Sequence, residues 1–233
     1  MRSTFLLISL FLLAGQARSQ EAKTYTINSI KDNKEELVRD VYRYPQFLEG
    51  TAMYTDGNST PARFNYHRLF DQVLFLSPKG DTLALARPEI YKYVVIGADT
   101  FYVQDKGYLE RMTHFRGVNL SRKGAIKFIG FEKKGLYGTY SSVISAESRG
   151  NIDNEGSGVN QKVQVDENSV YRTQTRYFLS DEYNNFFPAN KKNFYNLFFN
   201  KEKQLREYLG KHEVNFNKEK DLLALITFLH SVN

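Results

Sequence analysis

The chain has 233 residues, a formal net charge of +6, and neither cysteine nor tryptophan. The absence of cysteine excludes disulfides, thiol catalysis and zinc sites built on thiolates, and we therefore expect no lipid anchor on a cysteine. The positive charge is spread among acidic residues without a dense Lys/Arg cluster, so we expect no nucleic-acid partner.

The first residues have the pattern of a secretory signal peptide. A basic start, Met1–Thr4, precedes the apolar run Phe5–Ala14, and the small residues Ala17 and Ser19 stand before a cleavage position. The run is about half the roughly 20 residues that a transmembrane helix needs. We therefore expect a signal peptide over 1–19, no transmembrane segment in the mature chain, and export to the periplasm, the outer envelope or the medium.

The chain after the signal peptide divides into three parts. Residues 20–44 are polar and form an N-terminal arm, in which Asp32–Tyr42 is either a short helix or extended. Over 45–186 turn signals recur about every 8–12 residues, and no helical stretch is long enough to connect parallel strands. This spacing predicts a mainly antiparallel β body, sandwich-like or roll-like. With helices in 187–233, the fold class is α+β.

The strands expected in the body alternate with turn signals. Asp56-Gly57 and Gly97-Ala98-Asp99 mark hairpins, and Ser77–Asp81 marks a further turn. In chain order, the expected strands are Phe47–Tyr54, Ala62–Arg68, Gln72–Leu76, Thr82–Ala86, Tyr91–Ile96, Thr100–Val103, Tyr108–Met112, Val118–Leu120, Ala125–Phe131 and Ser169–Leu179.

A long loop interrupts the β body. Glu147–Asp166 is rich in Gly, Asn, Ser and charged residues, which predicts a flexible loop. Within it, Asn151–Gly156 imitates the start of a calcium-binding loop. An EF-hand needs Glu at the twelfth position, and Lys162 stands there. We therefore expect no metal site.

Helical periodicity replaces the strand pattern in 187–233. The expected helices and their caps are Lys191–Phe199 after Asn190, Lys201–Lys211 after Asn200, and Lys218–Ser231 after Asn217. In the last helix Leu222, Leu225, Ile226 and Leu229 share one face. We expect this stripe to pack the segment against the β body.

No known catalytic motif is present. The chain has no GxSxG elbow, no SxxK, no HExxH and no Gly-rich phosphate loop. The four histidines, His67, His114, His212 and His230, are scattered without the spacing of a helical metal pair, and we expect a structural or surface role for His67. Asn58 and Asn119 begin formal glycosylation sequons. The sequence therefore assigns no catalytic, cofactor-binding or metal-binding residue and no cofactor, and a non-catalytic role is favoured over an enzyme.

Three stretches together carry a family resemblance. They are Gly50–Leu85 with its Asp-Gly turn, Gly135–Ser142 (GLYGTYSS), and the chain from Arg176 onward with its Lys-rich helical tail. This order resembles a group of uncharacterised secreted proteins from Bacteroidota, which carry a signal peptide, a β-rich body and such a tail. The match departs from the group at Leu136 and Thr139. The resemblance implies an architecture and export, without an activity or site residues.

Two classes of function compete. The absence of catalytic motifs, the edge-prone strands and the basic, aromatic-rich composition favour a non-catalytic exported module that binds a protein or another envelope partner. The alternative is a carrier of a small apolar or lipid-like ligand inside a curled sheet, and a hydrolase with an unrecognised site is a weaker third. A carrier would use inward aromatics such as Phe64, Tyr66, Phe101 and Phe128. We expect these to be core residues instead.

Overall fold

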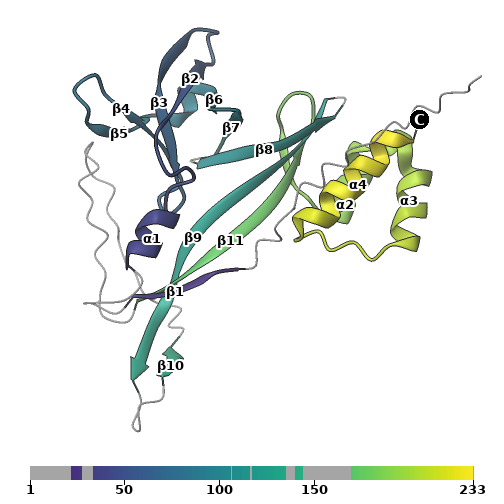
Figure 1. Ribbon diagram of the computed structural model, residues 1–233. Coiled ribbons are helices and arrows are strands. Elements are labelled where there is room, and N and C mark those ends of the chain that lie inside the picture. The colour runs from purple at the N-terminus through teal and green to yellow at the C-terminus, as the bar shows by residue number, and fades with distance from the viewer. Residues whose placement is uncertain are drawn as a thin grey trace, which may run out of the picture.

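An antiparallel sheet organises the chain (Figure 1). The computed structural model describes residues 22–27, 34–105, 107–115, 117–134, 140–143 and 169–232. The strands are β1 (Thr24–Ile27), β2 (Leu48–Tyr54), β3 (Ser59–His67), β4 (Gln72–Leu76), β5 (Thr82–Ala84), β6 (Tyr91–Ile96), β7 (Asp99–Gln104), β8 (Gly107–Phe115), β9 (Val118–Lys134), β10 (Tyr140–Val143), β11 (Ser169–Ser180) and β12 (Phe186–Pro188). Their order is β1-β11-β9-β8-β7-β6-β2-β3-β4-β5, with β10 on β9 and β12 on β11. With helices mostly in the C-terminal part, the predicted α+β class is confirmed.

The hairpins form at the turn residues that the sequence predicts. Between β2 and β3, Gly57 has a φ of 92°, and the Asn58 N–H donates to the Asp56 carboxylate at 2.9 Å. Gly97, between β6 and β7, has a φ of 59°. Glycine adopts these left-handed conformations without the steric cost of a side chain. Both predicted hairpins are therefore confirmed.

β9 is one continuous strand, so the prediction of two separate strands, Val118–Leu120 and Ala125–Phe131, is wrong. The polar stretch between them interrupts the apolar pattern in the sequence. In the structure β9 pairs with β11 from Asn119 opposite Ser180 to Phe131 opposite Ser169. The ladder hydrogen bonds keep the polar stretch extended. The β9–β11 pair spans the distance between α1 and the C-terminal helices (Figure 1).

The sheet curls over the strands from β2 to β8, which we call the β2–β8 region. β4 contacts β8 although four strands separate them in the sheet order. The curl encloses a core of buried residues, namely Ala52, Phe64, Tyr66, Val73, Val94, Ile96, Phe101 and Tyr108. The curling therefore turns one face of these strands into an interior.

The N-terminal residues add a strand and a helix to the sheet. Asp32–Tyr42 contains the helix α1 (Lys34–Asp40), so the helical alternative holds for this part. β1, which the sequence does not predict, pairs with β11. A buried cluster joins α1, β1, β9 and β11; its residues are Tyr25, Leu37, Val41, Ile126 and Tyr171.

Three helices cover the other end of the β9–β11 pair: α2 (Lys191–Leu197), α3 (Glu202–Lys211) and α4 (Glu219–Ser231). The apolar stripe of α4 is buried, as predicted. It packs in a cluster with the sheet residues Leu120, Tyr177 and Leu179. Within the described residues, no helix has both the length and the apolar character needed to cross a membrane.

One of the three predicted helix caps is confirmed. The side chain of Asn190 accepts an N–H of the first turn of α2. Asn200 does not cap α3, because it lies inside the 3₁₀ turn Phe199–Lys201, which runs directly into that helix. Asn217 does not cap α4 either, since the helix begins after Lys218, whose side chain makes no capping hydrogen bond.

Lys201 is the residue that ties the 3₁₀ turn to the end of α4. Its side chain is buried, and its Nζ donates to the carbonyl of Leu229 at 2.7 Å and to that of Val232. These carbonyls lie at a helix C-terminus, where intrahelical donors run out. A positive charge is also favoured there by the helix dipole.

The predicted signal peptide at 1–19 and the predicted loop Glu147–Asp166 lie outside the described residues.

Candidate ligand-binding site

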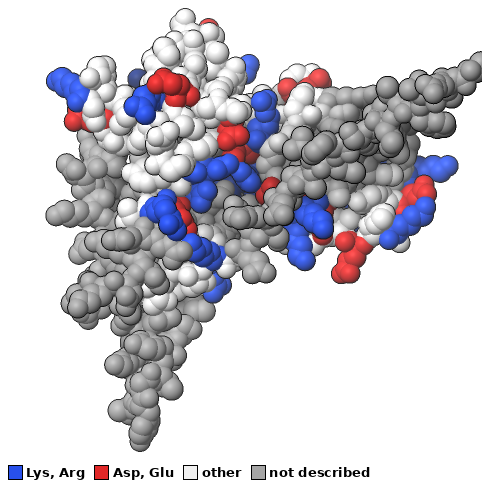
Figure 2. All heavy atoms as spheres, in the orientation of Figure 1, with Lys and Arg blue, Asp and Glu red and all other residues white. Residues whose placement is uncertain are grey.

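A cavity of about 640 Å³ is lined mainly by residues of three parts of the fold. They are residues 34–43, which contain α1 and which we call the α1 segment, the β2–β8 region, and the β9–β11 pair. Its lining contains two acidic side chains, Asp40 and Glu110. Its cationic side chains are Lys23, Arg43, Arg68, Arg122, Lys127 and Arg172. Figure 2 shows Lys and Arg gathered in the middle of one face of the molecule, with fewer acidic side chains among them. We call this site the basic cavity.

Arg43 and Arg68 reach the basic cavity from a small antiparallel bridge between Tyr42 and His67. The Arg43 N–H donates to the Tyr66 carbonyl at 2.8 Å, and the Arg68 N–H donates at 2.7 Å to the carbonyl that follows α1. Side chains two residues apart in an extended segment share a face. Arg43, Tyr66 and Arg68 therefore point to the cavity side, while Tyr42 and His67 pack edge to face on the other.

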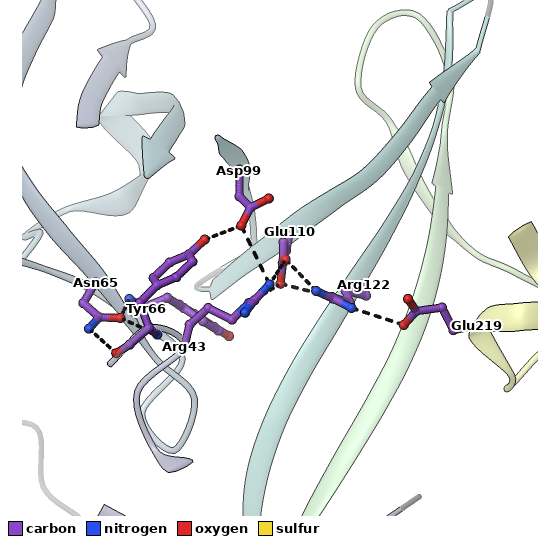
Figure 3. Close-up of polar contacts among 8 residues, drawn as sticks. Arg43, Asn65, Tyr66, Asp99, Glu110, Arg122 and Glu219 are labelled. Carbon is purple, nitrogen blue, oxygen red and sulfur yellow. Dashed lines mark hydrogen bonds and ion pairs between the residues drawn. The ribbon is translucent and has the colours of Figure 1, made fainter. Parts of the chain in front are cut away.

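Glu110, on β8, is held between two arginines (Figure 3). Its carboxylate accepts from Arg43 at 3.1 and 2.8 Å and from Arg122 at 3.1 and 2.7 Å. Arg122 also donates to Glu219 on α4 at 3.1 Å. The guanidinium of Arg43 also lies 3.7 Å from the carboxylate of Asp99 on β7. The Arg43–Glu110–Arg122 network therefore joins the α1 segment, the sheet and the C-terminal helices.

The network keeps its members charged. Burial alone would raise the pKa of Glu110, but the hydrogen bonds from Arg43 and Arg122 outweigh burial and hold that pKa below its usual value. Burial would lower the pKa of Arg43 and of Arg122, and the hydrogen bonds and charge of Glu110 outweigh it in both. The result is a fixed arrangement of charges at one wall of the cavity.

Replacing Glu110 by Gln tests the contribution of this network to stability. We expect a loss of about 2–4 kcal/mol at pH 7, near the low end for a broken buried pair because both guanidiniums keep some contact with water. Because the pKa of Glu110 is lower in the folded state, its ionisation stabilises the folded protein at pH values above the usual pKa of 4.5. This stabilisation is lost as the pH falls through the folded-state pKa. The difference in unfolding free energy between wild type and Glu110→Gln should therefore become smaller at acidic pH.

Denaturant unfolding at pH 7 and at pH 3 measures that difference. The matched control is Glu49→Gln, because the Glu49 side chain is 85% exposed and its ion pair with Arg63 spans 3.7 Å. The control should leave the unfolding free energy nearly unchanged. An equal loss for both variants, or a Glu110→Gln loss that does not change with pH, would contradict the role given to the network.

Three cations of the basic cavity lack a carboxylate partner. Among the described residues, no carboxylate lies within ion-pair distance of Arg68, Lys127 or Arg172. Lys127 and Arg172 lie directly opposite each other in the β9–β11 register, an arrangement that costs stability between like charges. Burial and the nearby charge of Arg43 lower the pKa of Arg68 and outweigh the opposite effect of the Glu110 and Asp40 charges, which lie beyond ion-pair distance. The cavity therefore presents positive charge suited to a negatively charged ligand.

The aromatic residues considered for an apolar carrier lie mainly in the core. Phe64 and Phe101 are buried in the β2–β8 region. Phe128 packs against the cluster beneath α1. Of the four, Tyr66 alone lines the basic cavity, and its hydroxyl donates to Asp71 at 2.7 Å. These positions agree with the expectation that the four aromatic residues pack in the core.

The histidines lie apart from one another. His67 is buried, its Nδ1 accepts the Phe70 N–H at 3.2 Å, and burial lowers its pKa to about 4. The other three contact different partners: His114 contacts Asn119, His212 contacts Tyr208, and His230 stacks on Phe115. Among the described residues, no group of His, Cys, Asp and Glu is placed to hold a metal ion. The buried position of His67 agrees with the structural role expected for it.

The two glycosylation sequons differ in access. Asn58 lies in the exposed β2–β3 turn. Asn119 is 4% exposed, and its side-chain amide donates to the Ser180 hydroxyl at 2.8 Å. Since a glycan is attached through that amide nitrogen, Asn119 is unsuited to modification in the folded protein.

The cavity has the charge and the hydrogen-bond donors to hold an oxyanion, and its cationic residues were not predicted as site residues from the sequence. Comparisons with protein-family models, curated proteins and solved structures find no significant match to this chain. Any functional proposal therefore depends on the geometry and on the sequence itself.

Proposed function

We propose that the chain is an exported, non-catalytic binding module that holds an acidic ligand or an acidic group of an envelope partner in the basic cavity. The observation that carries this proposal is the set of Arg68, Lys127 and Arg172, which line one cavity and have no carboxylate partner among the described residues. Export is supported by the signal-peptide pattern at 1–19 and by the resemblance to secreted Bacteroidota proteins.

An apolar carrier is less well supported. A cavity of about 640 Å³ is large enough for a small ligand. Arg68, however, is half-buried and has no carboxylate partner among the described residues, so its guanidinium would lose favourable hydration against an apolar molecule without gaining hydrogen bonds. An anionic ligand replaces that hydration with charge-assisted hydrogen bonds. We therefore favour the acidic partner.

Removing two cations from the cavity tests this function. Purified wild type should show a higher thermal unfolding midpoint with at least one acidic probe among citrate, glycerol phosphate and a poly-glutamate peptide, because a ligand that binds the folded state stabilises it. The double variant Lys127→Gln, Arg172→Gln should show a smaller shift. Mass spectrometry of the recovered probes should find them chemically unchanged, as a non-catalytic role requires.

The matched control is Lys79→Gln with Lys92→Gln, which removes the same charge at exposed positions that do not line the cavity. It should retain the wild-type shift. The proposed function is wrong if no acidic probe stabilises the wild type, or if both double variants respond alike. A fatty alcohol that stabilises the protein while every acidic probe fails would favour the apolar carrier, and a cleaved probe would favour a hydrolase.

A further inference from the structure

We propose that the ligand carries a phosphate monoester group and that Arg68 is its principal anchor, beside the fixed wall formed by the Arg43–Glu110–Arg122 network. This inference rests on the proposed function, namely that the basic cavity is a binding site. It goes further by naming the chemical group and the residue that recognises it.

Arg68 is fixed in the backbone and nearly free at its head group. Its N–H donates to the Val41 carbonyl at 2.7 Å, and its carbonyl accepts the Ile126 N–H at 3.2 Å, so the residue is held between α1 and β9. Among the described residues, its guanidinium has one hydrogen-bond partner, the backbone carbonyl of Asp40 at 3.4 Å. A guanidinium has five N–H donors in a planar fork. Most of the donors of Arg68 are therefore available to a ligand.

The two acidic residues of the cavity are already engaged. Glu110 accepts two hydrogen bonds from each of Arg43 and Arg122. Asp40 accepts from Lys23 at 2.8 Å and from the Tyr25 hydroxyl at 2.6 Å. Neither carboxylate makes an ion pair with Arg68. A counter-charge for Arg68 can therefore come from a ligand that enters the cavity.

The number of unpartnered charges favours phosphate over carboxylate. Arg68, Lys127 and Arg172 supply three positive charges to one cavity. A carboxylate neutralises one of them, whereas a phosphate monoester carries about −1.5 to −2 at pH 7 and offers three acceptor oxygens. Its oxygens also match the guanidinium fork in pairs. The volume of about 640 Å³ leaves room for an organic group beyond the phosphate.

Titration calorimetry with glycerol phosphate in low-salt, phosphate-free buffer tests the anchor. We expect saturable binding to the wild type, and a loss of affinity of about 10- to 100-fold in Arg68→Gln, the range for one charge-assisted hydrogen-bonded contact. Arg68→Lys keeps the charge without the fork and should fall between the two. Arg63→Gln, outside the cavity, should bind like the wild type. Circular dichroism verifies that each variant is folded, and Arg68→Lys serves as the test if Arg68→Gln is not.

Succinate is the comparison ligand, because it is a dianion without phosphate geometry. The inference is overturned if succinate binds as tightly as glycerol phosphate, if glycerol phosphate does not bind, or if the folded Arg68 variants bind it like the wild type. If citrate or poly-glutamate still binds in a manner that needs Lys127 and Arg172, the proposed function stands while the phosphate inference fails. Vesicles with phosphatidic acid, against phosphatidylcholine alone, separate a lipid phosphate from a soluble one.

Discussion

Phe101→Ala should lower the free energy of unfolding by about 3–5 kcal/mol, the cost of removing a buried aromatic ring and leaving a cavity. The Phe101 side chain is fully buried, and its ring centroid lies 5.3 Å from that of Tyr66. It does not line the basic cavity. Denaturant unfolding measures the loss, and anion affinity should stay unchanged in the folded variant.

The control for this substitution is Tyr183→Ala, which removes an aromatic ring that is 77% exposed. It should change the unfolding free energy by less than about 0.5 kcal/mol. A small loss for Phe101→Ala combined with weakened ligand binding would instead make Phe101 a pocket residue, and the carrier hypothesis would gain support.

Deleting residues 187–233 should make the remaining chain aggregate. The deletion removes α2, α3 and α4 and so uncovers Leu120, Tyr177 and Leu179, which pack against them in the folded protein. A contiguous apolar surface of this kind promotes association between molecules. Light scattering after size exclusion, together with binding of a hydrophobic dye, measures the effect.

The matched control is Phe199→Ser in the full chain, since Phe199 belongs to the same segment and is 76% exposed. It should stay monomeric with an unchanged unfolding midpoint. If the deleted chain were also monomeric and equally stable, the helices would be a separate partner-binding module rather than a cover for the sheet.

Local patterns predict those elements whose partners are close in the sequence. β4 and β6 begin and end at the predicted residues because apolar runs between adjacent turns define them. β1 and β12 were not predicted. β1 does alternate polar and apolar residues (TYTI), but it is four residues long and its partner is distant in the sequence: it pairs with β11, with Thr24 opposite Arg172. β12 pairs with β11 over Phe186–Pro188 alone.

The basic cavity is harder to predict than the fold because its cations come from separate elements. Arg43 and Arg68 meet through one isolated bridge, and Arg122 lies in a polar stretch that suggests a break between strands. One signal was available in the sequence. Glu110 lies two residues after Tyr108 in a predicted strand and thus on the same face as an apolar residue. A charge on a buried face needs a partner of opposite sign, although the sequence alone does not identify which one.

Arg122 connects the basic cavity to the C-terminal helices. It lines the basic cavity, and it donates to Glu219 in the first turn of α4. Coupling between two sites is reciprocal, because each changes the free energy of the other by the same amount. We therefore expect a ligand that contacts Arg122 in the cavity also to protect the start of α4 from opening and from proteolysis. Conversely, we expect loosening of α4 to weaken binding of the proposed ligand. Arg122 is joined in this role by Tyr177, which packs in one cluster with α4, and by Asn217, which precedes α4, because both also line the cavity.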